Sequence, residues 1–178
     1  MRNYLTFFII ISCIGFSSES ISINNSTVQF TGSHSFHDWT GVSSQLKTNI
    51  SCNQNNTICD FNFTIPWTSF DSGNDNRDNN MLYYVNAFDY PNIEMNFEQI
   101  DIINLINSKK QLTGILIING IDQSISIPLD FQLIGNHYKA RSSFQISLEN
   151  FNIERPSLLL IPIEDLIYIH VDISGNLN

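Results

Sequence analysis

Apolar and polar residues alternate with a period of two over most of this chain, and this pattern most constrains its fold. The alternation is clearest in residues 125–133, where every second residue is Ile, Leu or Phe. It recurs in residues 60–67, 144–148 and 167–173. A strand of this kind buries one face and leaves the other polar, as in antiparallel sheets. Together with turn signals such as Asn119-Gly120, the pattern predicts a single all-β domain of about eight strands, a barrel or a sandwich.

One stretch, residues 67–97, interrupts the alternation. Four apolar residues in it recur at helical spacing: Met81, Leu82, Val85 and Phe88. We expect a short helix over about residues 77–88, with Asp75 or Asn76 as its N-cap, because such residues accept hydrogen bonds from the first free backbone N–H groups. Tyr90-Pro91 would end it. The stretch holds more large apolar side chains than a surface helix needs, so we expect the helix to lie at or across the mouth of the barrel.

The first residues have the pattern of a secretory signal peptide. Arg2 precedes an apolar run over residues 4–16, and small polar residues follow it. The run is too short to span a bilayer, which takes about 20 apolar residues. We therefore expect residues 1–20 to be a signal peptide and residues 21–178 to form the mature domain, periplasmic or secreted. A lipid anchor on Cys13 is an alternative, since residues 10–13 faintly resemble a lipoprotein box.

The charge balance argues against nucleic acid as a partner. Lys and Arg total 8 against 17 Asp and Glu, which gives a formal net charge of −9. Such a chain repels phosphate backbones. No basic amphipathic helix and no transmembrane segment are expected in the mature chain, and a homo-oligomer is possible.

Two cysteines remain after removal of the expected signal peptide, Cys52 and Cys59. The residues between them are turn-like, so in an exported chain the pair predicts a disulfide across a hairpin. A metal or redox pair is the alternative, but six intervening residues are not a standard ligand spacing.

Other candidate sites fit their patterns poorly. His34 and His37, which Asp38 follows, would face different ways in a strand-to-loop segment, and no further metal ligand lies nearby in sequence. The acidic and amide residues over 71–78 miss the spacing of a calcium loop. The chain has no G-x-S-x-G elbow and no nucleophile with an evident base. We therefore predict no metal, no cofactor and no catalytic site.

Several motifs resemble those of a known family. They are Ser-Phe-Asp-Ser-Gly at residues 69–73 with Arg77, Asp78 and Met81; Gly-Ile-Leu-Ile-Ile-Asn-Gly-Ile at 114–121; residues 144–153; and His34 to Trp39. The sequence resembles the YceI-like proteins, an exported, lipocalin-like, polyisoprenoid-binding family. It departs from the pattern at Asn150, and at Asn79 and Asn80. The resemblance implies an eight-stranded antiparallel lipocalin-like barrel that holds an isoprenoid chain or a similar amphiphile.

The binding hypothesis depends on apolar side chains that would face the barrel interior. The predicted ligand-binding set is Phe63, Trp67, Phe70, Met81, Leu82, Val85, Phe88, Phe97, Phe131 and Phe144. An error of one residue in strand phase would exchange the two faces. With this set, the chain is predicted to be an exported, non-enzymatic binding protein for a polyisoprenoid or other long-chain amphiphile.

Two other hypotheses stay open at this point. The same side chains could pack into a solid core, which would make the chain a structural or interaction domain without a ligand. A less favoured hypothesis is an enzyme acting on an isoprenoid lipid, which would need a titratable cluster inside the cavity. A hollow interior would separate the first hypothesis from the second.

Overall fold

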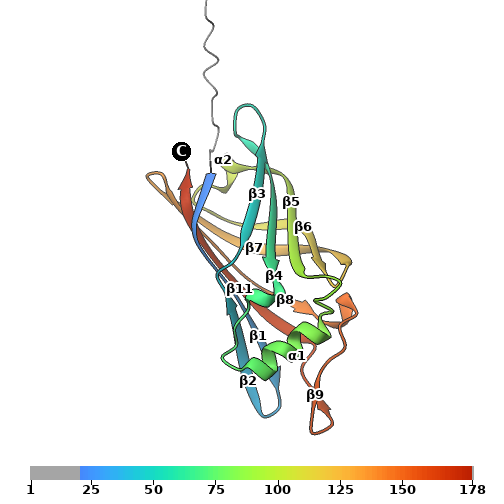
Figure 1. Ribbon diagram of the computed structural model, residues 1–178. Helices are drawn as coiled ribbons and strands as arrows, with labels where there is room; N and C mark the ends of the chain where they lie inside the picture. The colour runs from blue at the N-terminus through green and yellow to red at the C-terminus, as the bar shows by residue number, and fades with distance from the viewer. Residues whose placement is uncertain (1–20, 178) are drawn as a thin grey trace, which may run out of the picture.

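The computed structural model describes residues 21–177, which form one strongly curled antiparallel sheet (Figure 1). The nine strands lie in the order β2-β1-β11-β8-β7-β6-β5-β4-β3. Their bounds are β1 Ile21–His34, β2 His37–Ser43, β3 Lys47–Cys52, β4 Ile58–Pro66, β5 Asn92–Asp101, β6 Ser108–Ile118, β7 Ile121–Ile134, β8 His137–Ser147 and β11 Leu166–Leu177. The all-β prediction is confirmed, with nine strands in the sheet in place of about eight.

Short elements fill the connections. They are the helices α1 Asp75–Tyr84 and α2 Ile102–Leu105, the 3-10 turns η1 Trp67–Ser69 and η2 Glu149–Phe151, and a two-stranded ribbon of β9 Ser157–Leu158 and β10 Ile161–Pro162. In Figure 1, α1 crosses one end of the curled sheet and α2 lies at the other. We call these the α1 end and the α2 end. The predicted signal peptide and Cys13 lie outside the described residues.

The hairpin turns follow from their residues. Asn119 and Gly120 join β6 to β7 with φ values of +52° and +70°. Two positive φ angles define a type I′ turn, and its twist matches that of the flanking strands. Gly135, with φ of +64°, starts the turn between β7 and β8. The predicted turns at both places are confirmed.

The sheet is open between its edge strands β2 and β3, and the segment after β4 fills part of this gap. Asp71 exchanges two backbone hydrogen bonds with Val42 at the end of β2, with N···O distances of 2.9 and 3.0 Å. The buried Ser43 hydroxyl lies 2.6 Å from that of Ser69, which donates to the Pro66 carbonyl. These contacts join β2 to the end of β4 without strand pairing.

Helix α1 is held to this segment by the polar residues of the Ser-Phe-Asp-Ser-Gly motif and of the helix itself. The Asn74 side chain caps the helix by accepting from the Arg77 N–H at 3.1 Å, so the predicted caps at Asp75 and Asn76 are wrong by one or two residues. Both oxygens of Asp78 accept from the Ser72 N–H at 3.2 Å. Residues 77 and 78 therefore hold the start of the helix against the preceding loop.

The helix ends earlier than predicted, and this changes the position of Phe88. Asn86 adopts a left-handed conformation with φ of +52° and donates to the Tyr83 carbonyl, while the Ala87 N–H donates to the Leu82 carbonyl. These two bonds form a Schellman motif, a common helix end. The chain turns away after Val85, and Phe88 is 96% exposed. The prediction that Phe88 faces the interior is wrong.

The predicted disulfide is present. Cys52 and Cys59 are bonded, with Cα atoms 4.0 Å apart, and they join β3 to β4 directly beside the hairpin turn. The Asn53 side chain orders that turn by accepting from the N–H groups of Thr57 and Ile58. Cys59 is buried in the apolar cluster at the α2 end, together with Ile102. The bond therefore staples an edge of the sheet to its core.

We expect loss of this disulfide to destabilise the fold. The loop that it closes has about eight residues, which gives roughly 2.5 kcal/mol in the chain-entropy model. Urea unfolding of a Cys52→Ala/Cys59→Ala variant should show that loss. Adding a reductant should lower the midpoint of the wild type and leave the variant unchanged. A variant as stable as the wild type would show that the staple is dispensable.

Candidate ligand-binding site

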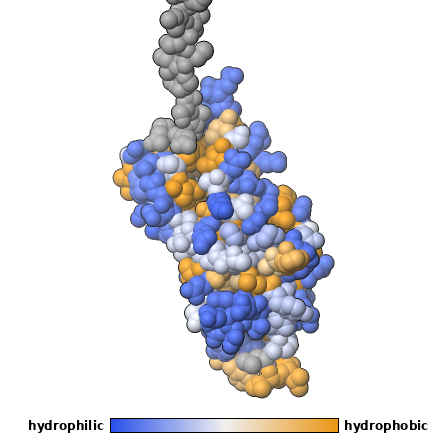
Figure 2. Space-filling view, in the orientation of Figure 1, coloured by the Kyte–Doolittle hydropathy of each residue, from blue (hydrophilic) through white to orange (hydrophobic). Residues whose placement is uncertain are grey.

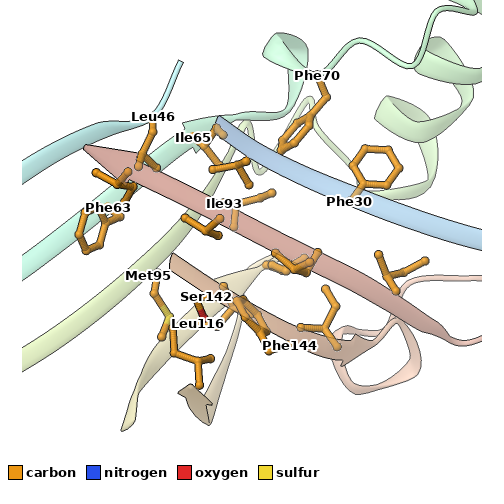
Figure 3. Close-up of a pocket in the computed structure, with 18 of the residues that line it drawn as sticks. Phe30, Leu46, Phe63, Ile65, Phe70, Ile93, Met95, Leu116, Ser142 and Phe144 are labelled. Atoms are coloured by element: carbon orange, nitrogen blue, oxygen red, sulfur yellow. The ribbon is translucent and has the colours of Figure 1, made fainter. Parts of the chain in front are cut away.

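The curled sheet encloses an elongated cavity of about 540 Å³. Apolar side chains from nearly every strand line it, including Phe63 of β4, Met95 of β5, Leu116 of β6 and Phe144 of β8. Figure 3 shows these side chains pointing into the space between the strands, with the Ser142 hydroxyl among them. The volume lies within the range of about 300–1,000 Å³ that is typical of small-molecule sites. The interior of the sheet is therefore hollow and apolar.

Eight of the ten predicted ligand-binding residues line this cavity: Phe63, Trp67, Phe70, Met81, Val85, Phe97, Phe131 and Phe144. The strand phase inferred from the alternation is thus correct. Leu82 packs against the neighbouring core and does not line the cavity, and Phe88 points to solvent.

The prediction missed the wall made by β1 and β11, and most of the β8 wall, of which it named only Phe144. Val28 and Phe30 of β1, Ala140 of β8, and Ile169 and Val171 of β11 all line the cavity. Their alternation was visible in the sequence, but the predicted set favoured aromatic residues near the helix. Weighting all inward positions equally would have found them.

Incomplete strand pairing explains how the interior stays hollow. β5 and β6 pair only over residues 94–96 and 115–117, and β7 pairs with β8 only as far as Asp130 and Arg141. Beyond that point the Ser142 hydroxyl donates to the Pro128 carbonyl at 2.6 Å. In a strand the N–H and C=O of one residue point to the same side, so the backbone of Pro128 faces β8. Proline has no N–H, and the strand pair therefore lacks a backbone donor at this position. The strands diverge there.

The two ends of the cavity differ in polarity. At the α2 end most lining residues are apolar, among them Ile21, Ile102 and Leu177, and Tyr138 and Arg141 of β8 are polar members of the lining away from the α1 end. At the α1 end His34, His37, Arg77, Asp78 and Asn80 also contribute to the lining. The cavity is therefore amphipathic along its length.

The Trp67 indole adds an unsatisfied donor near the α1 end. Its ring is buried, lines the cavity and packs against Phe70 with ring centroids 6.1 Å apart. Within residues 21–177 its Nε1–H has no hydrogen-bond acceptor. A buried unsatisfied donor costs about 1–3 kcal/mol. An acceptor brought by a bound molecule would remove that cost.

Tyr138 is a cavity-lining residue whose pKa is shifted. Its ring lines the cavity and stacks on Phe131 with centroids 5.5 Å apart, and its hydroxyl donates to the Ser22 carbonyl at 3.2 Å. Burial raises the pKa of Tyr138 to about 12, because the phenolate would lose its hydration. The group therefore stays neutral at physiological pH and ties β8 to β1 near the α2 end.

The part of the chain that the structure describes has neither a metal-ligand cluster nor a membrane-spanning helix. No group of three His, Cys, Asp or Glu side chains there could hold a metal ion. No helix over residues 21–177 has the length and apolar character needed to cross a bilayer.

Comparison with known proteins identifies the family of the chain. The YceI-like domain family matches residues 20–175, nearly the whole sequence. The chain belongs to the YceI-like family. A comparison with curated protein sequences gives no match.

Solved structures similar to this YceI-like protein have the same fold. BcnA of Burkholderia cenocepacia is 17% identical, with a TM-score of 0.70 over 84% of this chain and 95% of that one. A polyisoprenoid binding domain from Saccharophagus degradans, implicated in plant cell wall breakdown, is 14% identical, with a TM-score of 0.72 over 89% and 99%. The Campylobacter jejuni YCEI protein is 19% identical, with a TM-score of 0.61 over 99% and 98%. At these identities the likeness establishes the fold.

The raised pKa of Tyr138 predicts a loss of stability at high pH. The unfolded chain ionises its tyrosine near pH 10, whereas the folded chain does so at about 12. The folded state thus binds more protons between these values, so the free energy of unfolding should fall there by roughly 1–3 kcal/mol. The Tyr138→Phe variant should lose this component of the pH dependence. Urea unfolding of both proteins between pH 9 and about 11.5 measures this. If the free energy of unfolding fell equally steeply with pH in the wild type and the variant, the assignment to Tyr138 would be contradicted.

Proposed function

We propose that this YceI-like protein is an exported, non-enzymatic binding protein that holds a polyisoprenoid or similar long-chain amphiphile in the cavity of its curled sheet. The observation that carries the proposal is the apolar, hollow interior of about 540 Å³. The polyisoprenoid binding domain from Saccharophagus degradans, which has the same fold, adds support. The disulfide is consistent with an oxidising compartment outside the cytosol.

Burial of hydrocarbon supplies enough free energy for such binding. Each buried methylene is worth about 0.8 kcal/mol, so a dozen carbons contribute on the order of 10 kcal/mol. Association and ordering cost an estimated 4–15 kcal/mol. The hydrophobic term is thus of the size that is needed, and polar contacts have only to orient the ligand.

The ends of the cavity give the amphiphile a direction. The apolar tail would extend toward Ile21 and Leu177, and the polar head would lie among His37, Arg77 and Asn80. An oxygen near the head would accept from the free Trp67 indole N–H. Arg77 already donates to the Ser72 carbonyl at 3.4 Å, which holds its guanidinium near the cavity rim.

The two competing hypotheses make different demands on the cavity. A solid-cored domain requires a filled interior, which the cavity volume argues against. An enzyme requires reacting groups brought together. Of the titratable residues that line the cavity at the α1 end, His34, Arg77 and Asp78 are engaged in structural contacts. Elsewhere in the lining, Tyr138 donates to the Ser22 carbonyl and Arg141 pairs with Asp172. Mass spectrometry of organic extracts from the purified protein tests the proposal. No co-purified lipid and no uptake of added polyprenol would favour the ligand-free domain.

Two positions on the same short segment give a matched test of the pocket. Met81 lines the cavity, whereas Phe88, seven residues later, is 96% exposed. The Met81→Lys variant should lower polyprenol affinity at least about tenfold, because a charge at the cavity wall must be desolvated when hydrocarbon binds. The Phe88→Lys variant should bind as the wild type does. Fluorescence titration measures both, and circular dichroism checks the fold. Equal losses in the two variants would place the ligand elsewhere.

The Trp67 indole predicts a difference between two ligands. In the Trp67→Phe variant, affinity for a polyprenol should fall about fivefold, since a hydrogen bond from a buried donor is lost. Affinity for squalene, a hydrocarbon without oxygen, should not change, because squalene cannot accept a hydrogen bond from the indole. Parallel titrations of both ligands measure the difference. A parallel loss for squalene would mean that Trp67 acts only through packing.

A further inference from the structure

The ribbon of β9 and β10 displays two leucines at its turn. Leu159 and Leu160 are 74% and 97% exposed and connect Leu158 to its register partner Ile161. We call this pair the leucine turn. Figure 1 shows the ribbon projecting beyond the α1 end, and Figure 2 shows hydrophobic residues at that tip of the molecule. Both leucines thus lie in water at the end of a narrow protrusion.

The backbone of the leucine turn makes this choice of residues costly. Leu159 and Leu160 have φ values of +52° and +68°, the left-handed region that bulky L-residues avoid. Two-residue hairpin turns with two positive φ angles strongly prefer Asn and Gly. The same protein follows this preference at Asn119 and Gly120, between β6 and β7. The leucine turn therefore accepts backbone strain and displays apolar surface, a combination that points to a binding role.

The leucine turn lies beside the polar end of the cavity. The His34 ring Nε2 lies 3.1 Å from the Ile161 carbonyl, and the Glu164 N–H donates to the Ser33 carbonyl at 2.9 Å. His34 and Ile163 both line the cavity. Phe36, at the neighbouring tip between β1 and β2, is also exposed. The leucine turn and a second hairpin tip with one exposed aromatic side chain therefore lie at the end of the cavity where the ligand head would lie.

We propose that the leucine turn inserts into the surface of a lipid bilayer and so brings the α1 end of the cavity against the membrane. The choice of a bilayer rests on the proposed function, because a polyprenyl cargo resides in membranes. A narrow tip offers too little area for a stable protein interface, which buries about 800 Å² per partner. Residues 157–162, Ser-Leu-Leu-Leu-Ile-Pro, carry no charge, so their insertion desolvates no ionised side chain. With a net charge of −9, the chain should enter zwitterionic surfaces through apolar contact and avoid anionic ones.

The Leu159→Asn/Leu160→Gly variant tests the proposal, because it installs the residues that the turn itself prefers. Its thermal midpoint should stay equal or rise, while its co-flotation with phosphatidylcholine vesicles should fall at least about tenfold. Ile134→Asn is the control, since Ile134 is 82% exposed in the turn region at the α2 end, and it should float as the wild type does. The wild type and both variants share the same N-terminal segment, so a difference in flotation between them is due to the substituted turn.

Three outcomes would overturn the docking proposal. The first is equal flotation of the wild type and the leucine-turn double variant. The second is an equal loss of flotation in the double variant and in Ile134→Asn. The third is a wild-type dimer in light scattering that is absent in the double variant, which would assign the tip to a second copy. Uptake of polyprenol from detergent micelles, measured in parallel, separates this proposal from the proposed function. If flotation depends on the leucine turn but the protein takes up no polyprenol, the proposed ligand is rejected and the membrane docking is retained. If the protein takes up polyprenol but flotation does not depend on the turn, only the docking proposal is rejected.

Discussion

The sheet curls around an apolar interior that its own side chains do not fill, and the other features of the molecule follow from this. Inward residues alternate along every long strand, so the hydrophobic effect favours closure of the sheet. Yet β5 separates from β6, and β7 from β8, after a few paired residues. Backbone hydrogen bonds lost there are replaced by single contacts such as that from Ser142 to Pro128. The result is a wide cross-section whose wall is apolar and whose centre the side chains do not fill.

An open sheet of this kind needs something other than strand pairing at its edges, and the segment over residues 67–78 supplies it. Asp71 bonds to Val42 of β2, Ser69 links Ser43 to the end of β4, and Asp78 holds the loop between them. The residues that resemble a family motif are thus structural first, and they place Trp67, Phe70 and Met81 in the cavity wall as a consequence. The same segment therefore closes the sheet and completes the wall of the site.

The period of two predicted the strands, the hairpins and the inward face, because one buried face requires that pattern whatever the partner strand is. It could not predict where neighbouring strands separate, since that depends on register between segments distant in sequence. Helical spacing placed Phe88 beside Val85, but the spacing has meaning only while the helix continues, and Asn86 ends it. The amide and acidic residues over 74–76 could each cap the helix, so the cap was correct in kind and wrong in position. The leucine turn carried a signal that was overlooked, since two leucines at the centre of a short hairpin contradict turn chemistry.

The hollow interior also links the stability of the fold to whether the cavity is filled. In large-to-small core substitutions an empty cavity costs about 24 cal/mol per Å³, and a whole domain is stable by only about 5–15 kcal/mol. At that rate 540 Å³ would cost about 13 kcal/mol, which is comparable to the whole margin, so the wall has to be held by contacts that do not cross the cavity. The disulfide and the Tyr138 hydrogen bond to β1 act in this way at the α2 end, and the loop contacts of Asp71 and Ser69 do so at the α1 end. A ligand that fills the space would stabilise the folded state by mass action. With the wall held in this way, folding does not depend on a ligand, and the proposed ligand would add stability to a fold that forms without it.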